Sequence, residues 1–197
     1  MARTREQVIA AAVEQLVDVG FDRLSIDALA ARSGVARSTI YRNWPDRSVL
    51  LAEAYLRIQG CGLEPVVASG DLAADLRRHG ARLVARLTSD AWQQTVPSLI
   101  SGAARNETIG ALAAGFSADR RRELRQVFTA AEASGRLSYP ERIDSAIERF
   151  VGPFFYRRMV ARADLDDGFV TDQVEATLQQ VGWVEGPPPH PTCWRAT

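Results

Sequence analysis

Residues 25–44 read SIDALAARSGVARSTIYRNW, and this stretch of sequence decides the fold. Apolar side chains recur at helical spacing before the glycine, at Leu24, Ile26, Leu29 and Ala30. The spacing predicts a short amphipathic helix, with Ser25 capping it through its hydroxyl and Asp27 near the positive end of its dipole. Gly34 stands where this helix must stop, because glycine enters the left-handed conformation without steric cost. The stretch therefore predicts two short helices joined by a tight turn, a helix-turn-helix.

The second helix of this motif carries its polar side chains outward. Val35 and Ile40 are expected to close a small core, which leaves Arg37, Ser38, Thr39, Tyr41 and Arg42 on the outer face. Arginine forks match the O6 and N7 atoms of guanine, and hydroxyls reach bases or phosphates. Pro45 ends the helix and Asp46 begins the next one. We expect the second helix to lie in the major groove of double-stranded DNA.

Local charge agrees with this interpretation better than total charge does. The chain has 24 basic and 24 acidic side chains, and every basic residue is an arginine. The segment 32–47 nevertheless sets four arginines (Arg32, Arg37, Arg42 and Arg47) against Asp46 alone, and Arg3 and Arg5 are expected to form a basic amino-terminal arm. One basic patch on a balanced chain is typical of a protein that touches DNA with one part only.

Residues 2–55, from ARTREQVIAAAV to LLAEAY, resemble the tetracycline-repressor-like (TetR) regulators in order and spacing. A first helix ends at Gly20-Phe21, the helix-turn-helix follows, and the step Trp44-Pro45 leads into a long helix. A looser likeness to the regulatory domain of one TetR subgroup continues through GRLSYPERIDSAIERFVGPFFYRRMV. The resemblance implies a transcription regulator, usually a repressor, and not an enzyme.

The resemblance also implies roles for single residues. Positions that approach bases in the family are matched by Arg37, Ser38, Thr39 and Arg42, and positions that hold phosphates by Ser25, Tyr41, Asn43 and Arg47. The chain departs from the commoner pattern at Ala36, where a capping serine is frequent, at Trp44, usually phenylalanine, and at Arg47, usually lysine. Ser33 or the turn backbone is expected to replace the missing cap. For the two hydroxyl residues of the recognition helix, a capping or solvated role is the alternative.

The remaining sequence predicts an all-α protein of about nine helices, because helical periodicity persists and no convincing strand pattern occurs. We expect a DNA-binding domain over 1–48 with its motif at 25–44, a helical regulatory and dimerisation domain over 49–184, and a proline-rich tail over 185–197. Buried helix faces are predicted at Leu72, Leu76, His79, Leu83 and Leu87, and at Leu124, Val127, Phe128 and Ala131. The arginine run 120–125 is expected to be a solvated face.

The segment 143–160 is apolar on more than one side, so its helix should be buried on two sides. With a helix that follows Asp164, Asp166 and Asp167 and ends at Gly182, it predicts a two-fold homodimer interface. The expected interface residues are Ile147, Val151, Phe155, Met159, Val170, Val174 and Leu178. Two copies would read two half-sites of a palindromic operator about 34 Å apart.

A regulatory ligand is expected in the helical domain, where Pro153 should kink the helix near 149–153 and leave room beside phenylalanines. The ligand would be a small apolar or aromatic effector that releases the protein from DNA. The candidate contacts are Tyr55, His79, Trp92, Asn106, Phe116, Phe128, Phe150 and Phe154. The alternative is that these aromatic side chains form an ordinary core.

Other classes of function find little support in the residues. No nucleophile, metal or nucleotide motif supports an all-α enzyme, so we expect no catalytic residues, metal or cofactor. A ligand-independent or architectural DNA-binding protein is the alternative. No apolar run reaches the length of a membrane span and no signal peptide opens the chain, so we expect a cytoplasmic protein without membrane contact. Cys61 and Cys193 are expected to be free thiols.

Overall fold

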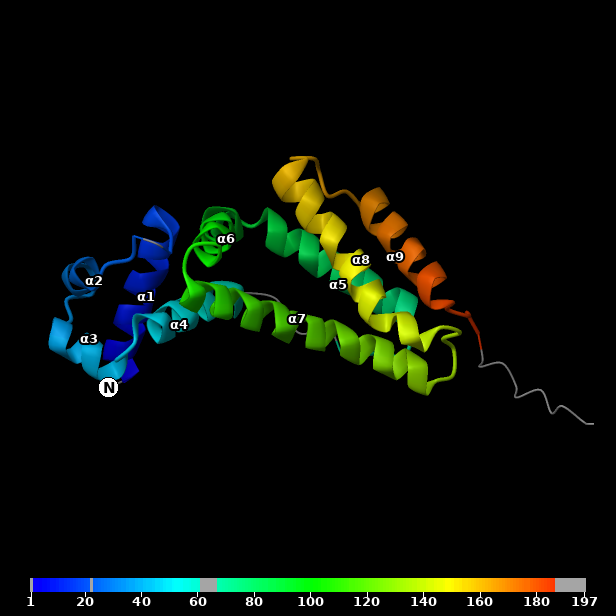
Figure 1. The fold of residues 1–197 in the computed structure, drawn as a ribbon, viewed down its shortest axis with the longest axis horizontal. Helices are drawn as coiled ribbons and strands as arrows, with labels where there is room; N and C mark the ends of the chain where they lie inside the picture. The colour runs from blue at the N-terminus through cyan, green and yellow to red at the C-terminus, as the bar shows by residue number, and fades with distance from the viewer. Residues whose placement is uncertain (1, 22, 61–66, 187–197) are drawn as a thin grey trace, which may run out of the picture. The chain divides into compact units, whose positions relative to one another are not determined.

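The computed structural model describes residues 2–21, 23–60 and 67–186, which form nine α-helices (Figure 1). The helices are α1 (Ala2–Val19), α2 (Ile26–Ser33), α3 (Arg37–Asn43), α4 (Arg47–Gly60), α5 (Leu72–Thr88), α6 (Asp90–Ala103), α7 (Glu107–Ala133), α8 (Ile143–Phe155) and α9 (Asp167–Val181). Extended pairing in these residues is limited to one isolated bridge between Leu137 and Trp183. The all-α prediction is therefore confirmed. None of the described helices has the length and apolar character needed to cross a membrane.

The described residues cluster into two compact units. The first unit takes its residues from 1–63 and 88–118, and the second from 64–87 and 119–197. The first unit is larger than the domain expected to end at residue 48, because α4 packs against α1 and α6 packs against both. Helix α7 contributes residues to both units.

The core of the first unit is formed by one face from each of its first four helices. Fully buried members of this core include Val8, Ala12, Leu16, Leu29, Ile40, Leu50 and Ala54. Burying each of the larger apolar side chains contributes about 1.5–3 kcal/mol, so this face fixes how α2 and α3 lie on α1 and α4. Gly20 ends α1 with a φ of +79°, and a Cβ there would lie 2.9 Å from the Cβ of Ser98 in α6. Glycine is therefore required at that turn.

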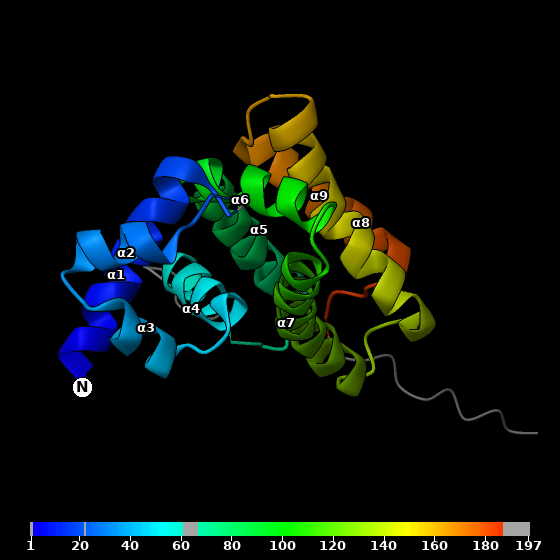
Figure 2. The ribbon, with the colours of Figure 1, turned by 60° about the vertical axis from the view of Figure 1, so that its left-hand side comes forward.

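The second unit buries the two helical repeats that the sequence predicts, except for Leu83 of α5, which is half-buried. Leu72, Leu76 and Leu87 of α5 are buried, as are Leu124, Val127, Phe128 and Ala131 of α7. The arginine run of α7 faces solvent and is paired with carboxylates: Arg121 binds Glu148 at 2.7 Å and Arg122 binds Asp119 at 2.9 Å. The expected solvated face is therefore present. Helices α8 and α9 run side by side in opposite directions (Figures 1 and 2).

Helix α5 meets α8 and α9 at a glycine. A Cβ on Gly80 would lie 2.7 Å from the Cγ1 of Val170, and within 3.8 Å of the rings of Phe150 and Phe154. The rings of Phe150 and Phe154 are 5.5 Å apart, and Phe154 meets Phe169 edge-on at 4.9 Å. These contacts form a close-packed aromatic centre beside α5.

Helix α8 does not stop at its proline. It continues through Pro153 to Phe155 and then widens into a π-helical turn over Tyr156–Val160, where the amide of Ala161 donates to the carbonyl of Tyr156 at 2.9 Å. The departure from α-helical geometry thus lies after the proline, beyond the segment 149–153 where the sequence predicts a kink.

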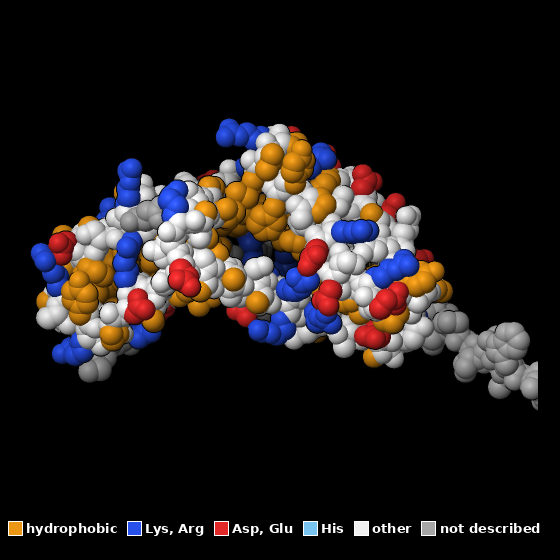
Figure 3. Space-filling view, viewed as in Figure 1, with side chains coloured by type: hydrophobic (Ala, Val, Ile, Leu, Met, Phe, Trp, Pro, Cys, Tyr) orange, Lys and Arg blue, Asp and Glu red, His pale blue; other side chains and the backbone are white. Residues whose placement is uncertain are grey.

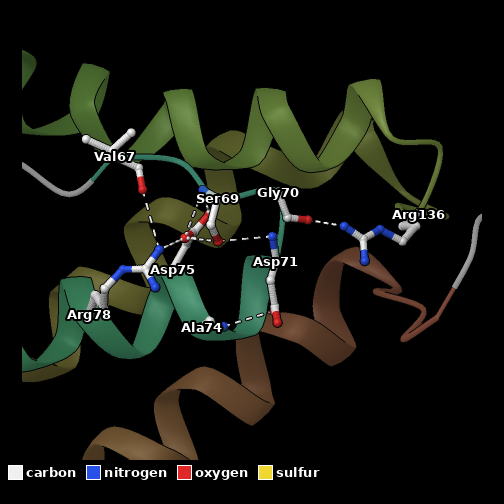
Figure 4. A network of polar contacts seen from close by, with 8 residues as sticks. All are labelled: Val67, Ser69, Gly70, Asp71, Ala74, Asp75, Arg78 and Arg136. Carbon is white, nitrogen blue, oxygen red and sulfur yellow. Dashed lines mark hydrogen bonds and ion pairs between the residues drawn. The ribbon is translucent and has the colours of Figure 1, made fainter.

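A buried carboxylate holds the segment that precedes α5 in the second unit (Figure 4). Asp75 is fully buried, accepts hydrogen bonds from the amide of Ser69 at 2.9 Å and its hydroxyl at 2.7 Å, and pairs with Arg78. Arg136 donates to the carbonyl of Gly70, and its guanidinium lies 4.3 Å from the ring centre of Trp183. The segment before α5 is therefore anchored by polar contacts instead of by apolar burial.

Candidate nucleic-acid interface

The first helix of the motif begins where the sequence predicts, but not through the predicted cap. Ser25 is extended, and its hydroxyl makes no capping hydrogen bond. Instead its amide donates to the Oε1 of Gln15 at 2.8 Å, so a buried side chain of α1 holds the start of α2. The hydroxyl cap predicted for Ser25 is therefore wrong, and the contact of Ser25 with α1 is made by its backbone amide instead. Asp27 lies in the first turn of α2, as expected.

The turn between the two helices has the predicted geometry. Gly34 adopts a φ of +69° and its amide donates to the carbonyl of Ala30 at 3.1 Å. Ala36 occupies the N-cap of α3 without a side-chain cap. The Ser33 hydroxyl accepts a hydrogen bond from the amide of Val35 at 3.3 Å and donates to the carbonyl of Leu29 at 2.6 Å. Ser33 therefore stabilises the turn itself and does not cap α3.

Helix α3 is divided between a buried face and an exposed face. Ile40 is fully buried and Trp44, just after the helix, is nearly so. Thr39 is half-buried, whereas the other candidate DNA contacts of the helix are exposed: Arg37, Ser38, Tyr41, Arg42 and Asn43. Tyr41 exposes 54 % of its surface, and the Asn43 side chain donates to the carbonyl of Thr39 at 2.7 Å. Six of the eight predicted contacts thus lie on α3, whereas Ser25 precedes α2 and Arg47 begins α4; charged side chains stand out around this part of the surface (Figure 3).

The arginines of the motif differ in their partners. Arg37 pairs with Asp27 at 2.8 Å, joining α3 to α2. Arg32 pairs with Asp18 of α1, also at 2.8 Å. Arg42 makes no hydrogen bond or ion pair with another described residue. The sequence count of four arginines therefore overstates the positive charge that is unpaired, because it ignores carboxylates from α1 and α2.

Arg47 has a structural contact in addition to its predicted role at a phosphate. Its Nη2 donates to the carbonyl of Phe21 at 2.7 Å and so joins the start of α4 to the end of α1. Beside it, the Oδ1 of Asp46 accepts a hydrogen bond from the amide of Ser48 at 2.8 Å, which lowers the pKa of Asp46. Asp46 therefore begins α4 as predicted.

The amino-terminal arginines do not form an arm. Helix α1 begins at Ala2, so Arg3 and Arg5 lie in its first turns. Arg5 binds Glu53 of α4 through two hydrogen bonds of 2.8 and 2.6 Å. The indole of Trp44 donates to the same carboxylate at 2.8 Å.

Glu53 therefore joins its own helix α4 to α1 and to the end of α3, and it was not among the residues that the sequence predicts. A buried indole N–H needs an acceptor, and this was the available signal. It could not identify which acidic residue of the following helix would supply the oxygen.

The candidate ligand contacts fall into both units. The first unit contains Tyr55, Trp92, Asn106 and Phe116, and the second contains His79, Phe128, Phe150 and Phe154. The structure brings the rings of Tyr55 and Phe116 to 4.3 Å. Asn106 is exposed, and its Oδ1 accepts a hydrogen bond from the amide of Ile109 at 3.2 Å, which caps α7.

His79 is the most unusual of these residues. Only 8 % of it is exposed, and its Nε2 has no hydrogen-bond partner in the part of the chain that the structure describes. Burial, assisted by the positive charge of Arg82, lowers the pKa of His79 to about 4, so the imidazole is neutral at pH 7. The Nε of Arg82 is likewise buried and has no hydrogen-bond partner among the described residues. Arg82, three residues further along the same helix, was not among the sequence-predicted contacts.

The candidate dimer contacts also divide by burial. Ile147 and Val174 lie in the core of the second unit, whereas the others are half-buried: Val151, Phe155, Met159, Val170 and Leu178. Next to them, Tyr156 and Val160 expose 62 % and 68 % of their surfaces. Hydrophobic side chains are visible over the end of α8 and the following turn in Figure 3.

The described residues contain no group of three or more histidine, cysteine or acidic side chains that could hold a metal ion. Cys61, Cys193 and His190 lie outside the described residues, as does the tail from residue 187 onward. The features described above are those of a helix-turn-helix DNA-binding protein: a short helix, an exposed polar face and a buried core behind it.

Two family models match the chain. The model described as bacterial regulatory proteins, tetR family, matches residues 8–54, and the tetracyclin repressor-like C-terminal domain matches residues 66–177. The chain therefore belongs to the TetR family of transcriptional regulators, and its N-terminal domain binds DNA. Members of this family are transcription factors and not enzymes.

Similar proteins span nearly the whole chain. The uncharacterized HTH-type transcriptional regulator YdeS of Bacillus subtilis is 26 % identical over 172 residues, covering 87 % of this chain and 86 % of its own. Among solved structures, the flavonoid-responsive regulator FrrA has a TM-score of 0.71 at 22 % identity, covering 91 % of this chain and 95 % of its own. A TetR regulator from Agrobacterium tumefaciens has a TM-score of 0.70 at 23 % identity, with the same coverage of 91 % and 95 %. These two structural likenesses show the fold.

Proposed function

We propose that this chain is a repressor that binds a palindromic operator as a homodimer and leaves it when a small apolar or aromatic effector binds. The observation that supports operator binding most strongly is the exposed polar face of α3, opposite the buried Ile40. In this proposal Arg37, Ser38, Thr39 and Arg42 read bases, and Ser25, Tyr41, Asn43 and Arg47 hold phosphates. The partner is chromosomal DNA, so the protein would act in the cytoplasm.

The dimer is supported by the apolar surface at the end of α8. Phe155 and Met159 are half-buried and Tyr156 and Val160 are exposed, so this surface gains from burial against a second copy. Val151 of α8 and Val170 and Leu178 of α9 would extend the contact, while Ile147 and Val174 would support it from within. A two-fold axis would set two α3 helices about 34 Å apart, which matches successive major grooves on one side of DNA.

The effector site is supported by the polar atoms buried in the second unit. His79 and Arg82 each carry a buried nitrogen without a hydrogen-bond partner among the described residues, and an unmet buried polar group costs about 1–3 kcal/mol. A ligand oxygen near both would satisfy them, with Phe128, Phe150 and Phe154 close to its apolar part. Tyr55, Trp92, Asn106 and Phe116 lie in the first unit and form a separate set of candidate contacts. A coupling free energy of about 1–3 kcal/mol between effector binding and DNA binding would change the DNA affinity roughly 5–150-fold.

Genomic footprinting with the purified protein tests operator binding. Arg37→Ala or Arg42→Ala should lose about 1–3 kcal/mol at the operator if the residue reads a base, and Arg47→Ala should weaken all sites alike. Arg122→Ala, which removes an exposed ion pair of α7, is the matched control. Footprints unchanged by both recognition-helix variants would contradict the assignment. A preference for no sequence would favour an architectural DNA-binding protein.

Light scattering and ligand titration test the other two parts. A monomer at micromolar concentration would contradict the dimer. Compounds that weaken operator binding by the wild type should lose that effect in His79→Phe, which keeps an aromatic ring but removes the polar nitrogens. An effector that acts equally on both proteins would exclude His79 from the site.

A further inference from the structure

The ion pair between Asp27 and Arg37 lies on the surface that would face DNA. Asp27 stands in the first turn of α2 and Arg37 is the first residue of α3, and the two side chains meet at 2.8 Å between Oδ1 and Nη1. Each side chain exposes 64 % of its surface. Exposed pairs of this kind contribute little to folding, because water and salt screen them and side-chain entropy opposes them. The pair is therefore not explained by stability.

The guanidinium of Arg37 has more donors than Asp27 can use. An arginine presents five N–H groups in a rigid planar fork, and the contact with Asp27 occupies Nη1. The remaining donors are free to meet the O6 and N7 atoms of a guanine. A carboxylate behind the fork limits the directions in which it can point. Asp27 thus orients a base-reading side chain before DNA arrives.

We propose that Asp27 is a positioning residue that sets the sequence specificity of this regulator by holding Arg37 toward the bases and away from the phosphates. This inference rests on the proposed function, in which Arg37 reads a base. On a wrong sequence, Arg37 would turn to a phosphate and leave the Asp27 carboxylate unpaired beside the DNA backbone. Like charges repel there, so Asp27 weakens non-specific binding more than operator binding.

Neighbouring arginines provide the contrast. Arg42 lies about one and a half turns further along α3 and has no such carboxylate among the described residues. Arg32 has a carboxylate partner, Asp18, which comes from α1 and holds an arginine that is not on the recognition helix. Among the ion pairs of the described residues, only that of Asp27 with Arg37 joins the two helices of the motif.

The experiment measures binding of the full-length protein to its footprinted operator and to a scrambled duplex of equal length, across a range of salt concentrations. The variants are Asp27→Asn, Asp27→Glu, Arg37→Ala and the double variant Asp27→Asn/Arg37→Ala, with Asp18→Asn as the matched control. Asp18→Asn also removes an exposed partner of a motif arginine. Asp27 also stabilises α2 through its negative charge near the positive end of the helix dipole. Thermal melting of each variant measures this loss of stability separately from any loss of sequence specificity.

We expect Asp27→Asn to bind the scrambled duplex about 3–10-fold more tightly and to lower the ratio of operator to scrambled affinity about tenfold. Asp27→Glu should restore part of that ratio, and the double variant should show no further loss beyond Arg37→Ala. Asp18→Asn should leave the ratio within about twofold of the wild type.

The inference is overturned if Asp27→Asn keeps the wild-type ratio of operator to scrambled affinity. It is also overturned if this variant binds both duplexes equally less tightly and melts at a lower temperature. A ratio that still changes in the Arg37→Ala background also overturns it, because Asp27 would then act without Arg37. If Arg37→Ala by itself keeps the wild-type ratio of affinities, the conclusion concerns Arg37 and not Asp27. That result refutes the base-reading role of Arg37 in the proposed function.

Discussion

Two neighbouring residues of α3 should respond to truncation in opposite ways. Ile40 is fully buried and Tyr41 exposes 54 % of its surface, so Ile40 belongs to the core and Tyr41 to the exposed face that we propose as the DNA-binding side. Ile40→Ala removes apolar atoms from a site that cannot refill, which should cost about 2–5 kcal/mol. In a chain of 197 residues, each kcal/mol lowers the melting temperature by about 2–4 °C. We therefore expect a loss of roughly 4–20 °C.

Tyr41→Ala should change stability by no more than about 0.5 kcal/mol, since it removes a largely solvated ring. Operator affinity should nevertheless fall, because the phenol is one of the proposed phosphate contacts. Calorimetry gives the melting temperature and gel retardation gives the affinity. Ile40→Val, expected to cost about 0.5–1.5 kcal/mol, provides the intermediate point on the stability scale.

Equal melting temperatures for Ile40→Ala and the wild type would refute this orientation of α3, with Ile40 inward and Tyr41 outward. The same conclusion would follow if Tyr41→Ala unfolded more readily than Ile40→Ala. Either result would mean that the helix is rotated and that the polar face of α3 is turned toward the protein.

Three further perturbations test other parts of the structure. Gly34→Ala should lower the free energy of unfolding by about 1–2 kcal/mol, measured by thermal melting, because alanine is strained at a φ of +69°. A Cβ there would meet nothing within 4 Å, so no steric clash adds to this loss. Gly80→Ala should lose about 1–3 kcal/mol, since its Cβ would lie 2.7 Å from Val170, and Val170→Ala in the same chain should restore part of that loss. Urea unfolding should show the free energy of unfolding decreasing as pH falls from about 6.5 to about 4, because the unfolded chain protonates His79 in that range and the folded chain does not. His79→Gln should flatten this slope, and an unchanged slope would place the effect in other groups.

The parts of the fold that the sequence predicted correctly depend on neighbours along the chain. Ile26, Leu29 and Ala30 stand at helical spacing in α2, with Leu29 fully buried, and Gly34 supplies the left-handed backbone conformation that ends the helix. Asp46 precedes the next helix and accepts a hydrogen bond from the amide of Ser48, two residues further along the chain. Each of these interactions is local, so periodicity and a few special residues were sufficient.

The parts that the sequence did not predict depend on contacts between elements. Ser25 is held by Gln15 of α1, Arg5 by Glu53 of α4, and the segment before α5 by the buried Asp75. A sequence pattern identifies a carboxylate but does not identify the arginine or amide that it will meet. The sequence pattern also does not predict how deeply each residue is buried. Ile147 and Val174 lie in the core, although they stand at the same helical spacing as neighbours that are half-buried.

These pairings change how a chain without net charge should meet DNA. Arg5 and Arg32 already pair with carboxylates, so a DNA phosphate would have to replace these partners in order to bind either arginine. Arg37 would offer a base only the donors that Asp27 leaves free. Exposed ion pairs are weak, so the exchange costs little where the duplex offers a good acceptor. Where it offers a poor one, the carboxylate is left beside the phosphates and the exchange is unfavourable. Internal pairing should therefore weaken indiscriminate attraction to the DNA backbone and leave discrimination between sequences to the α3 side chains that we propose as base contacts.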